Sequence, residues 1–173
     1  MVLQGYHGTS LQAAESILRD EFEYSDATNW LGIGVYFWGD AKPYADGLAC
    51  ARWWVHTKHF SPWGILKSDI QSEKIFDCVH DDKCRQTFTQ MKKKLLEKFG
   101  ANTCTEQEYI DGIFAIIKRK FDVIVFFTKG DAMEHLDAAD RLIVNLQVQI
   151  CVSDTKCIMR TQLLDQGDTN DRA

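Results

Sequence analysis

The sequence contains no apolar run of about 18 residues, the length at which a membrane-spanning helix becomes a candidate. Its first residues also lack the basic and then apolar layout of a secretory signal peptide. We therefore expect no membrane-spanning segment, no membrane partner and a cytoplasmic location.

A framework of paired cysteines is also missing, because the six cysteines are scattered along the chain. In a chain long enough to bury a sizeable core, this pattern favours reduced thiols over disulfides. The closest approach to a metal-binding pattern is Cys78, His80 and Cys84, with Cys104 further along. Because this spacing fits no common zinc site, we predict that the protein holds no metal ion.

Positive charge is not in excess, since 20 Lys and Arg residues stand against 25 Asp and Glu residues, a net charge of −5. This balance argues against non-specific binding to nucleic acids or anionic membranes, although 91–98 and 118–120 are locally basic. No repeat or linker divides the 173 residues. We predict a single domain over 1–164 and a disordered tail over 165–173.

What the sequence does contain is a mixture of strand and helix patterns. Strands are expected at 2–6, 31–38, 63–70, 74–79, 122–127, 142–152 and 157–164. Helices are expected at 9–18, 43–55, 84–99 and 105–117. The first and the last have capping-box spacing at Thr9 and Thr105. Asp40 and Pro43 mark the start of the second. Because strands and helices do not alternate regularly, we predict an α+β fold.

The strand expected at 142–152 has one polar face. Its amide residues Asn145, Gln147 and Gln149 alternate with aliphatic residues, so the three amides point to the same side. One interpretation is an outer face in water. The other is a binding face, since amides are suited to fixing the hydroxyl groups or the carboxamide of a ligand.

Three segments resemble, in order, the signature segments of ADP-ribosyltransferases. They are YHGTS…AAESIL at 6–18, LGIGVYFW at 31–38 and QICVSDTKCI at 149–158. The similar branch is the one related to diphtheria toxin and the poly(ADP-ribose) polymerases, marked by a histidine, a tyrosine and a late-strand glutamate. Small prokaryotic or phage-type domains of this branch carry the first two segments together. The resemblance implies an α+β split β-core of two packed sheets with inserted helices.

The resemblance also implies a substrate, NAD, whose nicotinamide–ribose bond is broken through an oxocarbenium-like transition state. His7 would then bond the adenosine ribose, and the Gly8 backbone would bind the nicotinamide carboxamide, where a side chain would obstruct the approach. Thr9 or Ser10 would bond a ribose hydroxyl. Taken singly, His7 is also consistent with a solvated residue at a helix start.

Tyr36 would stack on the nicotinamide ring, with Gly34 beside it where the backbone is approached closely. Tyr44, or a nearby tryptophan, is the candidate for the second wall of that slot. Tyr36 alone is equally consistent with core packing on an apolar strand.

The third segment departs from the family pattern, because Gln149 stands where the glutamate is expected, with Gln147 two residues before it. A glutamine has no charge to stabilise a cation and cannot act as a base. Glu134, with His135 beside it in the polar loop before the strand, is an alternative third catalytic residue.

We therefore expect a mono-ADP-ribosyltransferase, a toxin or phage-related effector that modifies a protein or nucleic acid. The alternative is a non-catalytic NAD-binding or nucleotide-binding module. A third interpretation, a scaffold without ligand, depends only on the tryptophan-rich stretch 51–63.

Overall fold

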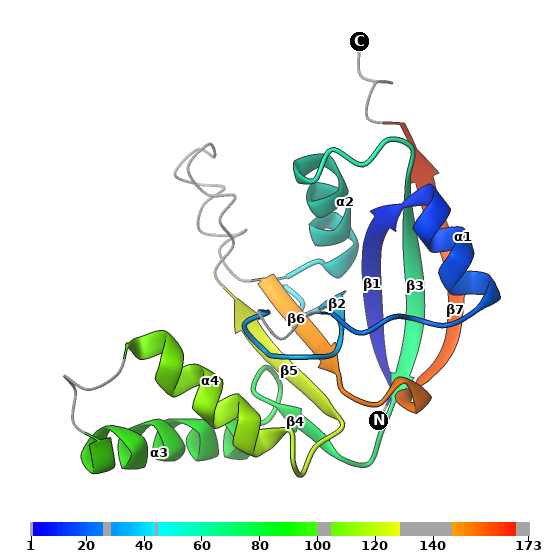
Figure 1. Cartoon of the computed structure of the whole chain (residues 1–173). Helices are drawn as coiled ribbons and strands as arrows, with labels where there is room; N and C mark the ends of the chain where they lie inside the picture. Colours follow the sequence, from blue (N-terminus) through cyan, green and yellow to red (C-terminus); the bar gives the residue numbers. More distant parts are fainter. Residues whose placement is uncertain (1, 26–28, 44, 100–104, 129–146, 169–173) are drawn as a thin grey trace.

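The structure, a computed structural model, describes residues 2–25, 29–43, 45–99, 105–128 and 147–168 (Figure 1). Its strands are β1 (Val2–Ser10), β2 (Val35–Gly39), β3 (Trp63–Gln71), β4 (Ile75–Asp77), β5 (Val123–Thr128), β6 (Gln147–Val152) and β7 (Ile158–Gly167). Its α-helices are α1 (Leu11–Arg19), α2 (Gly47–Thr57), α3 (Asp82–Phe99) and α4 (Glu106–Ile117). None of these helices combines the length and the apolarity that crossing a membrane requires.

Hydrogen bonds join the seven described strands into one mixed sheet in the order β4-β5-β6-β2-β1-β3-β7. β4 and β5 are parallel, and the other neighbours are antiparallel. The sheet is narrow at its centre, because β1 and β2 pair only at Gly5 with Gly39 and at Tyr6 with Trp38. In Figure 1, β1, β3 and β7 run side by side, and β5 and β6 lie at an angle to them. The strands thus form one bent sheet where the resemblance implies two packed sheets.

The first strand is longer than the sequence pattern predicts. β1 continues to Ser10 because it pairs with β3 along its whole length, from Val2 with Gln71 to Ser10 with Trp63. The cap of α1 is therefore Ser10, whose side chain accepts a hydrogen bond from the Ala13 N–H at 3.2 Å. The expected cap at Thr9 is wrong by one residue.

The second predicted strand and the second predicted helix both begin later than expected. Gly32 has a φ of +76°, a left-handed conformation that ends extended structure, and β2 starts only at Val35. Helix α2 is capped by Asp46, which accepts from the Ala49 N–H at 2.9 Å. Asp40 instead accepts from the Gly47 N–H at 2.8 Å and holds the chain before the helix.

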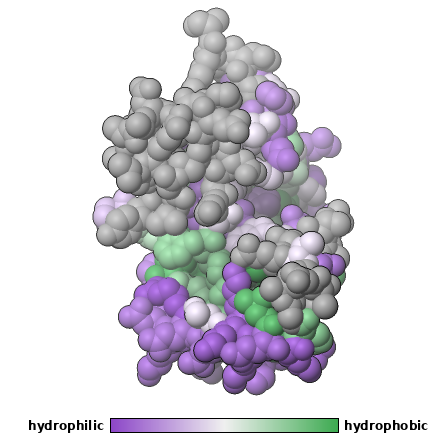
Figure 2. Space-filling view, turned by 90° about the vertical axis from the view of Figure 1, so that its left-hand side faces the viewer, coloured by the Kyte–Doolittle hydropathy of each residue, from purple (hydrophilic) through white to green (hydrophobic). Residues whose placement is uncertain are grey.

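Helices α3 and α4 lie side by side at one end of the molecule (Figure 1). The capping box predicted at Thr105 and Glu108 is confirmed. Ile113 and Phe114 of α4 pack with Ile124 of β5 in one core cluster. No residue of α3 is fully buried, and the lower part of this end is hydrophilic with an apolar area above it (Figure 2).

The last strand corrects the predicted boundary of the domain. β7 extends to Gly167, which pairs with Trp63, so residues 165–167 belong to the sheet and not to a tail. Arg52 of α2 donates to the Asp165 carboxylate at 2.8 Å and ties this end of β7 to the helix. Of the strand predicted at 142–152, residues 142–146 lie outside the described residues.

The alternation of β2 decides which side chains reach the candidate site. Phe37 points into the core cluster on one face of the sheet. Tyr36 and Trp38 point to the other face, where the register places Tyr36 opposite Cys151 and Trp38 opposite Gln149 of β6. The tyrosine and the polar face of β6 therefore share one side of the sheet.

Candidate functional site

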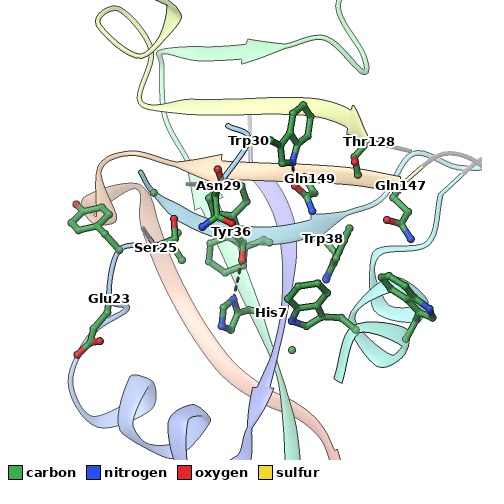
Figure 3. Close-up of a pocket in the computed structure, with 17 residues that line it drawn as sticks. His7, Glu23, Ser25, Asn29, Trp30, Tyr36, Trp38, Thr128, Gln147 and Gln149 are labelled. Atoms are coloured by element: carbon green, nitrogen blue, oxygen red, sulfur yellow. Dashed lines mark hydrogen bonds between the residues drawn. The ribbon is translucent and has the colours of Figure 1, made fainter. Parts of the chain in front are cut away.

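A cavity of about 500 Å³ opens where β1 and β2 separate (Figure 3). Its volume falls within the range of small-molecule sites. Beyond Tyr6, β1 has partners in β3 but none in β2 among the described residues, so the sheet itself opens here. The lining residues are His7, Gly8, Glu23, Tyr24, Ser25, Asn29, Trp30, Gly34, Val35, Tyr36, Phe37, Trp38, Trp53, Trp54, Thr128, Gln147 and Gln149.

His7 stands at the point where the pairing of β1 with β2 stops. Its Nδ1 lies 2.8 Å from the carbonyl oxygen of Tyr36. Because a carbonyl only accepts, Nδ1 carries the proton, and Nε2 of the neutral ring remains an acceptor. Burial lowers the pKa of His7, and the hydrogen bond to Tyr36 opposes this shift only in part. Phe22 and Phe37 hold the ring edge-on, with centroids 5.4 and 5.9 Å away.

Tyr36 forms the middle of the cavity wall. Its hydroxyl donates to the Gly32 carbonyl oxygen at 2.7 Å, which fixes the ring from its far end. Burial raises the pKa of Tyr36 above its ordinary value, so the side chain is a neutral phenol at physiological pH. Among the described residues no aromatic ring stacks on Tyr36, so a flat ligand could stack on its ring.

Gln149 is held by a residue that the sequence patterns did not single out. The Trp30 Nε1–H donates to Gln149 Oε1 at 2.6 Å. Because an indole N–H can only donate, this bond fixes which end of the amide faces Trp30. The Gln149 amide therefore presents its NH₂ group, a donor, to the cavity (Figure 3). Phe114 and Phe126 pack edge-on against Trp30 and keep it in place.

Gln147, two residues before Gln149 on the same face of β6, is only 4% exposed. The interpretation of this face as a solvated outer surface is therefore wrong for Gln147. Within the described part of the chain its amide makes no hydrogen bond, yet it lines the cavity. The amide is not one of the fully enclosed unpaired side-chain atoms of the described residues, so it is accessible from the cavity and available to a bound molecule.

Three tryptophans form the wall beside Gln147. Trp38 comes from β2, and Trp53 and Trp54 come from α2. Their ring centroids lie 6.0 to 6.4 Å apart, with interplanar angles of 51 to 78°, so no two of the three rings stack face to face. The Lys58 ammonium lies 4.6 Å from the centroid of Trp54. A nearby tryptophan was the alternative to Tyr44 for the second wall of the nicotinamide slot, and that role stays a prediction.

Two of the predicted site residues lie in β1 outside the cavity lining. Thr9 pairs with Gly64 of β3, and the Ser10 hydroxyl caps α1. Tyr44, Glu134, His135 and Asn145 lie outside the described residues.

The two predicted glycines line the cavity, but protein packing already explains them. A Cβ on Gly8 would lie 2.7 Å from the Ala51 carbonyl oxygen and from Val55 of α2. A Cβ on Gly34 would lie 2.5 Å from Cys151 Sγ. The absence of a side chain at both positions is thus required by the fold itself.

Several lining residues were not predicted from the sequence. Glu23 is an exposed carboxylate at the rim, and the Ser25 hydroxyl is buried without a hydrogen-bond partner. Trp30 ends a stretch that reads as a polar loop, and a tryptophan in such a loop was the one available signal. Trp53 and Trp54 were noticed only as part of an aromatic-rich stretch.

The described residues contain no cluster of three or more His, Cys, Asp or Glu side chains arranged to hold a metal ion. The His80 ring bonds the buried Asp77 carboxylate at 2.9 Å, and the Cys84 thiol donates to Asp81. The five cysteines in the described ranges are free thiols. Burial raises the pKa of Cys78 to about 12, so this thiol stays protonated and is a poor metal ligand.

Neither a scan against protein-family models nor searches of curated proteins and of solved structures find a match for this chain.

Proposed function

We propose that this chain is an NAD-dependent mono-ADP-ribosyltransferase. It would break the bond between nicotinamide and ribose and transfer ADP-ribose to a macromolecular acceptor. The observation that carries this proposal is that one cavity gathers His7, Tyr36 and Gln149 from three distant segments. These are the segments that resemble the family, and they occur in the same order along the chain.

The lining residues suit the parts of NAD. Tyr36 offers a phenol ring for the nicotinamide, and His7 offers a neutral acceptor at Nε2 for a ribose hydroxyl. As the glycosidic bond breaks, its electron pair leaves with the nicotinamide nitrogen and positive charge develops on the ribose. The acceptor nucleophile then bonds the anomeric carbon and releases its proton to solvent.

Gln149 in place of a glutamate determines which reactions we expect of the proposed enzyme. With Oε1 held by Trp30, its NH₂ group donates to a ribose hydroxyl oxygen, which orients the sugar. It supplies no negative charge for the developing cation. We therefore infer slow turnover with water and a dependence on the acceptor, without chain elongation.

Other features support the same proposal. The strands form one sheet, but its narrow junction between β1 and β2 lies where a split β-core would divide. The free thiols fit the cytoplasmic location predicted from the sequence. A toxin or phage-related effector remains the biological role that the resemblance suggests.

The test is to incubate the purified chain with labelled NAD and a cell lysate, and to follow nicotinamide release and label in the protein and nucleic-acid fractions. We expect His7→Ala and Tyr36→Ala to reduce both signals at least tenfold. His59→Asn, an exposed histidine with a positive φ of 54°, is the matched control. Unchanged labelling in both cavity variants would refute this assignment of the site.

The Trp30–Gln149 bond also favours a second candidate, a module that binds NAD without turning it over. In that case NAD raises the melting temperature while nicotinamide release stays at background. Gln149→Glu separates the two, because one carboxylate oxygen keeps the Trp30 hydrogen bond and the other replaces the NH₂ group. If the ribose lies here, we expect nicotinamide release to rise about tenfold or more, with Gln162→Glu on exposed β7 as the control.

A further inference from the structure

Gln147 is a buried residue whose amide lines the cavity and makes no hydrogen bond within the described residues. The residue is 4% exposed, and its amide is not one of the fully enclosed unpaired side-chain atoms of the described residues, so it stays accessible from the cavity. An amide that lines a cavity without a partner from the protein can form its hydrogen bonds with a bound molecule. A carboxamide has a donor and an acceptor in one plane, so its natural partner is a planar group with the complementary pair.

The surroundings of Gln147 are aromatic. Trp38, Trp53 and Trp54 line the same cavity, and Trp38 lies near Gln147 on the side away from Asn29 and Ser25 (Figure 3). The three rings pack edge-on or tilted against one another, so none of them is stacked in parallel on another of the three. An amide edge beside aromatic faces is how proteins read single-stranded nucleobases, by hydrogen bonds to the base edge and stacking on its plane.

A positive charge accompanies these aromatic faces. Lys58 Nζ lies over Trp54, and Lys58 has no acidic partner within the described ranges. The neighbouring cation of α2, Arg52, is already paired with Asp165. Lys58 is thus placed to contact a phosphate next to a stacked base, in spite of the overall negative charge of the chain.

The register separates this region from the proposed nicotinamide position. Tyr36 lies opposite Cys151, Trp38 lies opposite Gln149, and Gln147 is a further two residues along β6. His7 contacts the chain at Tyr36. A dinucleotide that occupies His7 and Tyr36 would therefore leave Gln147 on the far side of Gln149.

We propose that Gln147 and the three tryptophans form a subsite for an unpaired nucleobase, and that the acceptor is a single-stranded nucleic acid. Base binding stands independently, whereas the acceptor role depends on the proposed transferase function. In the transfer step the bond between the anomeric carbon and nicotinamide breaks and its electron pair leaves with nicotinamide. A nitrogen of the base forms the new bond to that carbon, and the proton it loses passes to solvent.

The binding test uses short fluorescein-labelled RNA and DNA strands, single-stranded and duplex, and follows fluorescence anisotropy without NAD. We expect single strands to bind and duplexes to bind at least tenfold more weakly, since paired bases cannot enter the cavity. Gln147→Met keeps the volume but removes the amide, and should weaken binding of the preferred strand about tenfold. Gln162→Met, exposed on β7, should bind as the wild type does.

Three outcomes overturn the inference at different points. Equal binding of single strands by the wild type and Gln147→Met removes Gln147 from base recognition. Loss of the NAD-induced rise in melting temperature in Gln147→Met shows that the subsite holds NAD itself. Strands that bind through Gln147 but take up no label, while a protein fraction does, exclude nucleic acid as the acceptor. If nothing takes up label and NAD is not consumed, the transferase proposal fails and Gln147-dependent base binding still stands.

Discussion

The cavity has two halves, and the two glutamines of β6 show how they differ. Gln149, on the side of Tyr36, has its amide oriented by a 2.6 Å hydrogen bond from Trp30. Gln147, on the side of the tryptophans, is the more buried of the two but has no bond to its amide among the described residues. The protein thus supplies a hydrogen-bond partner for the Gln149 side chain, whereas the described residues supply none for the Gln147 side chain.

This difference separates structural from binding roles. A polar group that the chain satisfies by itself contributes to folding, and a ligand must compete with or adapt to its fixed orientation. A buried group that the chain leaves unsatisfied weakens the fold and is retained where a ligand completes it. The Tyr36 half is accordingly preorganised by the protein, and in our proposal a bound molecule completes the tryptophan half.

The largest expected effect comes from moving the helix that carries the tryptophan half. In Gly8→Ala the new Cβ would lie 2.7 Å from the Ala51 carbonyl oxygen and Val55 Cγ1. Helix α2 must shift, and we expect the free energy of unfolding to fall by about 2–3 kcal/mol, measured by urea denaturation. Binding of single strands should fall more than the NAD-induced rise in melting temperature.

Gly112→Ala provides the matched control for Gly8→Ala. A Cβ at Gly112 meets no atom within 4 Å, and the residue lies inside α4. There the same change should stabilise the protein by about 0.5–1 kcal/mol, because alanine favours the helix. A Gly8→Ala protein as stable as the wild type would show that the packing of α2 on β1 is looser than described.

Replacing each of the two glutamines by methionine should affect the stability of the protein differently. Gln149→Met leaves the Trp30 N–H without its acceptor, and we expect a loss of about 1–2 kcal/mol in unfolding free energy. Gln147→Met removes an amide that had no partner and fills the same space, so its effect should be neutral or stabilising. Urea denaturation of both proteins measures the difference.

A double-mutant cycle locates the source of that difference. Trp30→Phe removes the indole N–H and keeps an aromatic ring against Phe114 and Phe126. If the hydrogen bond is responsible, Gln149→Met should lower the free energy of unfolding much less in the Trp30→Phe background than in the wild type. Equal losses for Gln147→Met and Gln149→Met would contradict the contrast between the two halves.

Local signals in the sequence were sufficient for much of the fold. The capping box at Thr105 and Glu108 and the alternation around Gln149 involve neighbours only a few residues apart, and both are present in the structure. Errors came where tertiary pairing decides a boundary. β1 extends to Ser10 and β7 extends to Gly167 because β3 pairs with both of them, and no short window of sequence contains that information.

The same distinction applies to the candidate site. His7 and Tyr36 were expected to meet, and the structure brings them together through a hydrogen bond between residues 29 apart. Trp30 and Gln149 are 119 residues apart, and their contact depends on which strands are neighbours. The need for glycine at position 8 was anticipated, but its cause is helix α2 and not only the approach of a ligand.

The smallest expected effect is a pH dependence confined to the Tyr36 half. Burial lowers the pKa of His7 below its ordinary value, so the unfolded chain binds this proton more readily than the folded one. As the pH falls below about 6.5, the ordinary histidine pKa, the His7 contribution should therefore lower the free energy of unfolding. Above that pH neither the folded nor the unfolded chain carries the proton, so the contribution of His7 vanishes. One proton changes the stability by at most about 1.4 kcal/mol per pH unit.

The measurement is the difference in unfolding free energy between the wild type and His7→Gln from pH 7.5 to 5, because the other histidines contribute equally to both. Protonation also removes the Nε2 acceptor, so binding of NAD should weaken over the same range. Binding of single strands through neutral Gln147 and the tryptophans should change little, and a parallel loss of both activities would show that the two halves of the cavity act as one. Identical pH profiles for the wild type and His7→Gln would show that the imidazole is not the buried, neutral group that its bond to Tyr36 implies.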